Sequence, residues 1–83
     1  MIGVKVTRLK EAIVQFALNN SGKKKVRKAT IRGLARMTPY EFQTALPYLK
    51  YNDPIGKFIE EEHFYLIIDC DGIRRTILGD KEH

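Results

Sequence analysis

Hydrophobic residues recur every three or four positions through most of the first half of the chain, which is the spacing of one face of an α-helix. The first such run predicts a helix over residues 7–20, with Thr7 as its N-cap. A second run predicts a short helix over residues 30–37, capped by Thr30, and a third predicts a helix over residues 39–51. Three helices are therefore expected before residue 54.

The third of these helices has the clearest start. Thr38 and Glu41 have the spacing of a capping box, and Pro39 falls at the first helical position, where a missing N–H costs nothing. A second proline, Pro47, predicts a kink or a tightened turn without loss of the helix. The residues expected on the buried face are Phe42, Ala45, Leu46 and Leu49.

After Pro54 the apolar period shortens toward two, and β-branched and aromatic residues dominate. The segments HFYLIID and IRRTILG predict two strands of a hairpin, with the turn at CDG, residues 70–72. The short stretch KVRKA, residues 25–29, could add a third strand at the edge of that hairpin. Residues 1–6 are expected to form an arm or a pairing strand, and residues 80–83 a tail.

The chain has 83 residues, which predicts one domain spanning residues 1–83. No apolar run approaches the roughly 20 residues of a membrane span, and the start of the sequence lacks the pattern of a secretory signal. A cytoplasmic protein without a membrane partner is therefore expected. The single cysteine, Cys70, excludes an intramolecular disulfide.

The net charge of +5 is unevenly distributed. Residues 1–36 contain ten Lys or Arg and one acid, Glu11, whereas residues 37–83 contain five Lys or Arg and nine acids. A positive first half favours a polyanionic partner, because neutralised phosphates release their counterions. A solvated basic face without a partner is the alternative.

The order helix, short strand, helix, helix, hairpin resembles the winged helix-turn-helix domains of transcription regulators, an α+β fold with three helices and a C-terminal hairpin wing. The likeness is carried by TIRGLARM, TPYEFQTALPYL, NDPI and FYLIIDCDGIRRTIL. The resemblance implies that helix 39–51 enters the major groove and that the wing touches the DNA backbone. The residues that it places toward base edges are Tyr40, Gln43, Thr44 and Tyr48, of which Gln43 suits adenine and Thr44 offers a methyl or a hydroxyl.

Phosphate contacts are expected from the cations before and on the second helix, from the start of the third helix, and from two arginines just past the expected turn of the wing. These candidates are Lys23, Lys24, Lys25, Arg27, Lys28, Arg32, Arg36, Thr38, Arg74 and Arg75. Each lysine taken singly could equally be solvated surface.

Catalytic and metal chemistry find little support in the sequence. His63 follows three glutamates but lacks the i, i+4 helical spacing of a metal site, and Cys70 lies between Asp69 and Asp71, which disfavour a thiolate. No enzyme activity, metal or cofactor is expected.

The leading hypothesis is a double-stranded DNA-binding protein, a small transcriptional regulator acting as a homodimer. One alternative is a winged helix that binds a protein partner in a transcription or replication complex through Tyr40, Tyr48 and Tyr51. A second is a non-specific chromatin binder that uses the basic half alone.

Overall fold

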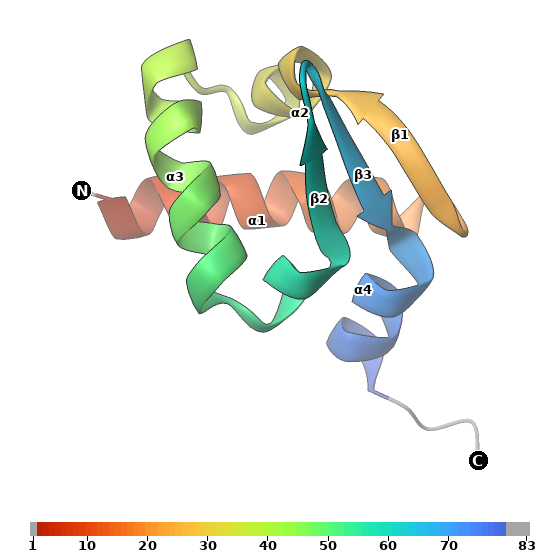
Figure 1. The fold of residues 1–83 in the computed structure, drawn as a ribbon. Helices are drawn as coiled ribbons and strands as arrows, with labels where there is room; N and C mark the ends of the chain where they lie inside the picture. Colours follow the sequence, from red (N-terminus) through yellow and green to blue (C-terminus); the bar gives the residue numbers. More distant parts are fainter. Residues whose placement is uncertain (1, 80–83) are drawn as a thin grey trace.

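The computed structural model describes residues 2–79 of the chain. Within that range it contains four α-helices, one short 3₁₀ helix and a three-stranded antiparallel sheet (Figure 1). The elements in chain order are α1 (Ile2–Leu18), β1 (Lys23–Arg27), α2 (Lys28–Ala35), α3 (Pro39–Asn52), η1 (Pro54–Phe58), β2 (Ile59–Glu62), β3 (Tyr65–Asp69) and α4 (Cys70–Leu78). The α+β class and the predicted order of three helices, an edge strand and a hairpin are thus confirmed, with a fourth helix, α4, after the β2–β3 hairpin.

Helix α1 begins five residues earlier than the position predicted from Thr7. Residues 2–6 form its first turns, so the expected arm or strand is wrong, and Thr7 is an internal residue whose hydroxyl donates to the carbonyl of Gly3 at 2.9 Å. Val6 lies at helical spacing from Leu9 and Ile13 and packs against the core. That contact favours a helix over the alternating pattern of the first residues. Residue 1 and the tail at residues 80–83 lie outside the described residues.

Helix α2 also begins earlier than predicted. Its first residue is Lys28 and its N-cap is Arg27, which makes no side-chain capping bond, so Thr30 is not the cap. The helix follows directly from β1, and the amide of Lys28 donates to the carbonyl of Phe64 at 2.8 Å. This long-range bond, absent from any local pattern, fixes the start of α2 beside the hairpin turn.

The sheet has the strand order β1-β3-β2, with both pairings antiparallel. Strand β1 therefore lies at the edge, as predicted for the basic stretch. On β3, Leu66 and Ile68 face the core and alternate with partly exposed neighbours, as the pleat requires.

The hairpin is displaced from its predicted position. Its turn is at His63 and Phe64, and the Cys-Asp-Gly segment forms the first turn of α4. The carboxylate of Asp69 accepts a hydrogen bond from the amide of Gly72 at 3.1 Å, which caps the helix. A Cβ at Gly72 would lie 2.4 Å from the ring of Phe58, so this glycine permits close packing and does not mark a hairpin turn.

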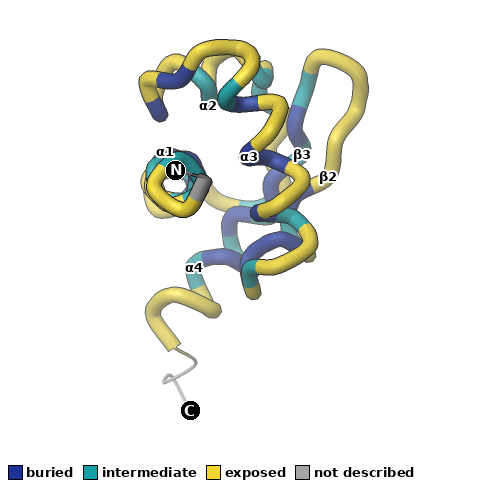
Figure 2. The backbone as a smooth tube through the Cα atoms, turned by 90° about the vertical axis from the view of Figure 1, so that its left-hand side faces the viewer, coloured by how far each residue is buried: buried dark blue, intermediate teal, exposed yellow. Residues whose placement is uncertain are grey.

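One hydrophobic core joins all the helices to the inner face of the sheet (Figure 2). Its largest fully buried side chains include Leu9 and Ile13 of α1, Ile31 of α2, Leu49 of α3 and Ile73 of α4. No helix among the described residues is long and apolar enough to cross a membrane.

Candidate nucleic-acid interface

Helix α3 has one buried face and one exposed, uncharged face. The buried face is the predicted one: Phe42, Ala45, Leu46 and Leu49. The exposed face, called here the α3 outer face, consists of Tyr40, Gln43, Thr44, Pro47, Tyr48 and Tyr51. It contains all four predicted base-reading residues, and the tyrosines are 76%, 51% and 81% exposed in chain order. The helix continues through Pro47 to Asn52, as predicted.

The charged residues that flank the α3 outer face are paired with other elements. On one side, the carboxylate of Glu41 lies 3.3 Å from the ammonium of Lys5 on α1. On the other side, the ammonium of Lys50 lies 3.3 Å from the carboxylate of Glu61 on β2. The uncharged face is therefore bordered by charges that already have protein partners.

The predicted capping box is present at the start of α3. The amide of Glu41 donates to the hydroxyl of Thr38 at 3.1 Å, and the amide of Thr38 donates to the carboxylate of Glu41 at 3.0 Å. The hydrogen bond from the Thr38 amide, together with Lys5, lowers the pKa of Glu41. Because Pro39 has no N–H and Thr38 is bonded in both directions, this helix start offers a phosphate little beyond the amide of Tyr40. Thr38 therefore caps the helix, and it is a weak candidate for a phosphate contact.

The cations of residues 23–36, called here the basic segment, number seven, and no acid interrupts them. Five are exposed and two are half-buried. They are Lys23, Lys24, Lys25, Arg27, Lys28, Arg32 and Arg36. Two of them have acidic partners on β2: Lys25 lies 3.2 Å from Glu62, and Lys28 lies 3.0 Å from Glu61.

The basic segment lies on two sides of the wing. Strand β1 occupies the sheet edge opposite β2, so Lys23, Lys24 and Arg27 are separated from α3 by the two wing strands (Figure 1). Arg32 and Arg36 instead belong to α2 and to the turn that leads directly into α3. The structure thus brings the cations of α2 and the turn close to the start of α3, and places those of β1 beyond the wing.

The turn between α2 and α3 has an unusual backbone at Arg36. This residue has φ 57° and ψ 52°, the left-handed region, where glycine is the usual occupant of a helix C-cap. Two other arginines hold the turn: Arg8 donates to the carbonyls of Ala35 at 3.1 Å and Arg36 at 2.5 Å, and Arg32 donates to that of Met37 at 3.4 Å. The side chain of Arg36 remains exposed. Arg8 had no sequence signal, because its partners lie 27 and 28 residues away.

The wing itself is acidic. Its hairpin, residues 59–69, contains four acids and neither lysine nor arginine. Phe64 at the turn is 78% exposed. Glu61 faces α2 and α3, where hydrogen bonds first from Lys28 and then from Lys50 lower its pKa. The wing is therefore tied to both helices by Glu61, and presents no arginine to a phosphate.

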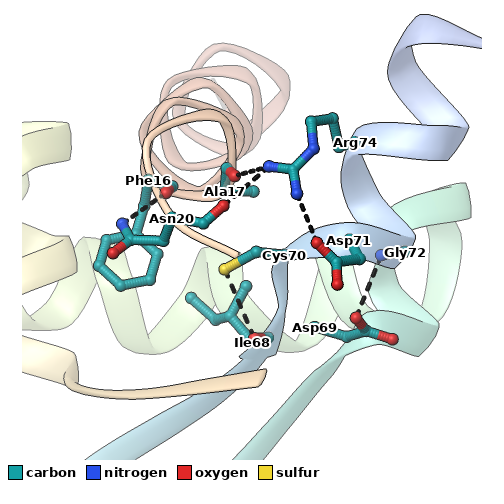
Figure 3. Close-up of polar contacts among 9 residues, drawn as sticks. All are labelled: Phe16, Ala17, Asn20, Ile68, Asp69, Cys70, Asp71, Gly72 and Arg74. Carbon is teal, nitrogen blue, oxygen red and sulfur yellow. Dashed lines mark hydrogen bonds and ion pairs between the residues drawn. The ribbon is translucent and has the colours of Figure 1, made fainter. Parts of the chain in front are cut away.

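Arg74 and Arg75 do not lie on the wing, so their predicted role there is wrong. Both belong to α4, which starts at the end of β3 remote from the hairpin turn. The guanidinium of Arg74 donates to the carbonyls of Ala17 at 2.8 Å and Asn20 at 2.7 Å, and pairs with Asp71 (Figure 3). Arg74 thus fastens α4 to the end of α1. Arg75 is exposed, but it is far from α3 along the fold.

Cys70 is fully buried at the start of α4. Its amide donates to the carbonyl of Gly22 at 2.9 Å, and burial raises the pKa of its thiol. A buried, protonated thiol packs as a small apolar side chain. It has no part in the interface.

Two hollows adjoin the helices of the interface. One, of about 380 Å³, lies between α1 and α2 and is bordered by Arg8, Glu11, Leu34 and Arg36. The other, of about 260 Å³, lies between α3 and the wing and is lined by Lys28, Phe42, Gln43, Leu46, Pro47 and Glu61. Gln43 and Pro47 therefore belong both to the α3 outer face and to the hollow beside the wing.

No protein family, curated protein or solved structure matches this chain.

Proposed function

We propose that the protein binds double-stranded DNA, with the α3 outer face in the major groove and the basic segment on the phosphate backbone. The observation that carries the proposal is the basic segment: seven cations in 14 residues without an acid, in the strand, helix and turn that lead into α3. Elsewhere, Lys5, Lys10, Lys50 and Arg74 are held in ion pairs. In the basic segment only Lys25 and Lys28 are paired in this way, which leaves Arg32 and Arg36 near the start of α3 and Lys23, Lys24 and Arg27 on β1 without a carboxylate partner among the described residues.

In this proposal the cations that contact phosphates and the α3 residues that contact bases are different residues. Phosphate contacts fix a protein on the duplex without reading sequence, whereas base edges are read by uncharged or charged side chains in the groove. Arg32 and Arg36 would lie against one strand near the start of α3. The cations of β1 would meet the duplex beyond the wing. The proposal includes a cytoplasmic location and a role as a transcriptional regulator.

Fluorescence anisotropy of labelled duplexes at several salt concentrations tests this function. We expect binding that weakens steeply between about 50 and 200 mM salt, because each neutralised phosphate adds about −0.9 to the slope of log K against log salt. Five exposed cations in the basic segment set a slope between about −3 and −5. Absence of binding at the lowest salt would refute the proposal. Steep binding without sequence preference would leave only the non-specific chromatin binder.

Homodimer formation belongs to the same proposal. A dimer would read two half-sites whose centres lie one helical turn apart, about 34 Å. Two chains per duplex at saturation, measured by analytical ultracentrifugation with labelled DNA, is the expected stoichiometry. A stoichiometry of one chain per duplex on a DNA with two half-sites would refute the homodimer and would not contradict DNA binding.

A protein partner is the second candidate, favoured by the aromatic character of the α3 outer face. Tyr40, Tyr48 and Tyr51 are all exposed on the α3 outer face, and tyrosine is enriched among the residues that dominate binding at protein interfaces. The exposed Phe64 on the wing adds a further apolar contact. This candidate predicts that Tyr48→Ala leaves DNA affinity unchanged, whereas insertion of α3 into the groove predicts weaker binding.

A further inference from the structure

We propose that the α3 outer face selects A·T base pairs and reads thymine through its 5-methyl group. This inference rests on the DNA binding proposed above and specifies which sequences the same surface accepts. Some side chains of α3 are free to contact a base edge, whereas others are already hydrogen-bonded or ion-paired within the protein. This difference determines which bases α3 can recognise.

The first step concerns guanine. The commonest specific contact to guanine is a lysine or arginine that donates to its O6 and N7 atoms. None of the six residues of the α3 outer face is a cation. Three lysines border this face, and each is paired with a carboxylate of the protein: Lys5 and Lys50 at 3.3 Å and Lys28, which lines the hollow beside Gln43, at 3.0 Å. The strongest guanine contact therefore has no available donor on this helix.

The second step concerns cytosine, whose amino group is read by a carboxylate. Glu41 is the only acid of α3. Its carboxylate accepts from the amide of Thr38 at 3.0 Å and lies 3.3 Å from Lys5. Because capping and pairing already use this carboxylate, α3 offers neither base of a G·C pair its preferred charged partner.

The third step concerns adenine and thymine. Gln43 is exposed, and a glutamine amide matches the N6 and N7 atoms of adenine with two hydrogen bonds. The hydroxyl of Thr44 donates to the carbonyl of Tyr40 at 2.9 Å, so its proton is occupied within the helix. Its methyl group and the acceptor lone pairs of its oxygen remain for a base.

The fourth step concerns the apolar surface beside Gln43. Pro47 lies one turn beyond Gln43 and Thr44, and residues three and four apart are neighbours on a helix. By this spacing its exposed ring and the methyl of Thr44 form a short apolar strip on the α3 outer face. Pro47 also lines, with the buried Leu46, the hollow of about 260 Å³ beside the wing. Such a strip suits the thymine 5-methyl group and gains nothing from the cytosine edge.

The test compares four duplexes of equal length by fluorescence anisotropy at low salt: an A·T-rich duplex, the same duplex with uracil in place of every thymine, a G·C-rich duplex, and a mixed sequence. We expect the A·T-rich duplex to bind at least tenfold more tightly than the G·C-rich one, since one good base contact is worth about that factor. Replacing thymine by uracil removes only the 5-methyl groups, and we expect it to weaken binding several-fold.

Two variants assign the effect to α3. Gln43→Ala is expected to reduce the A·T preference at least fivefold while keeping binding to the G·C-rich duplex, because the phosphate contacts are unchanged. Asn19→Ala, which removes an exposed side-chain amide just after α1, is the matched control and is expected to bind all four duplexes like the parent protein. Circular dichroism checks that both variants remain folded.

The outcomes distinguish this inference from the function beneath it. No binding to any duplex at low salt overturns DNA binding and the base preference together. Tight binding with equal affinity for A·T-rich and G·C-rich duplexes overturns the base preference alone. An A·T preference that survives the change to uracil overturns the methyl contact. If that preference is lost in Gln43→Ala, adenine alone is read in the major groove; if it persists in Gln43→Ala, the minor groove is read, where A·T pairs expose no methyl group.

Discussion

At the scale of single residues, the backbone at Arg36 favours glycine, whereas the proposed phosphate contact requires the arginine side chain. A left-handed backbone costs a residue with a Cβ roughly 1–2 kcal/mol relative to glycine. Arg36 adopts that backbone at the end of α2, and its exposed side chain makes no ion pair among the described residues. Strained positions persist where the surrounding structure holds them, as Arg8 and Arg32 hold this turn, and they cluster at functional sites. A phosphate contact is the function that its charge and its place before α3 support.

Arg36→Gly should separate stability from binding. We expect the free energy of unfolding, measured by urea denaturation, to rise by about 1 kcal/mol, since glycine relieves the left-handed strain. We expect DNA binding to weaken and the salt slope to flatten by about one contact.

Arg75→Ala serves as the control for this pair of measurements. Arg75 is exposed on α4 and remote from α3, so its removal should leave the salt slope unchanged. Suppose that Arg36→Gly left the slope of log K against log salt unchanged while Arg75→Ala made it shallower. The DNA contacts would then involve α4 and not the turn before α3.

At the scale of elements, two glycines show how differently one residue type can act. Gly56 in η1 packs against the end of α3, where an added Cβ would lie 2.1 Å from the carbonyl oxygen of Lys50. Gly33 lies inside α2, and an added Cβ there would meet nothing within 4 Å. The open space around Gly33 means that no close packing requires a glycine there.

Substituting alanine at the two positions should shift stability in opposite directions. Gly33→Ala should raise the free energy of unfolding by up to about 1 kcal/mol, the difference in helix propensity. Gly56→Ala must displace the backbone of η1 or α3, and we expect a loss of at least 2 kcal/mol, in the range of severe packing defects. Thermal and urea unfolding measure both. Equal melting temperatures for the parent and Gly56→Ala would contradict the packing of η1 on α3.

At the scale of the whole molecule, Glu61 joins three elements that lie far apart in sequence. Its carboxylate on β2 lies 3.0 Å from Lys28 at the start of α2 and 3.3 Å from Lys50 near the end of α3. These contacts lower the pKa of Glu61, Lys28 contributing most. A carboxyl whose pKa is lower in the folded state stabilises that state above the pKa of the unfolded chain, and this stabilisation is lost as the pH falls through the folded value.

Acid should therefore loosen the wing from the helices. We expect stability to decrease as the pH falls below about 4, where unfolded glutamates take up protons. Glu61→Gln should be less stable than the parent near neutral pH and should show a shallower decrease in acid. Glu60→Gln, on the outward side of β2, is the control, and melting temperatures across the pH range provide the comparison. If the melting temperatures of Glu61→Gln and the parent fell identically with pH, the ion pairs of Glu61 with the two lysines would not contribute to stability.

The parts of the fold that were predicted correctly depend on local signals. The capping box at Thr38 and the buried face of α3 both involve residues within a few turns of each other. The element order and the edge position of β1 followed from periodicity and composition. The start of α2 was missed because a long-range bond between Lys28 and Phe64 fixes it. Two further errors occurred where a short segment satisfied two patterns: the alternating residues at the start of the chain, and the Cys-Asp-Gly segment, which is also typical of a turn. In the second case Asp69 as an N-cap and the helical spacing of Cys70, Ile73 and Ile77 could have indicated α4.

The sequence by itself determined the start and buried face of α3, the identity of its outward residues and the separation of the basic segment from the acidic half, because capping, periodicity and charge count depend on residues close together in the chain. Only the tertiary structure decided which charges remain unpaired. Lys28 and Glu61 are 33 residues apart, and Arg74 reaches carbonyls 54 and 57 residues away. Such partners are selected by packing across the core. They leave Arg36 exposed before α3, whereas Arg32 holds the turn and Arg74 fastens α4 to the end of α1.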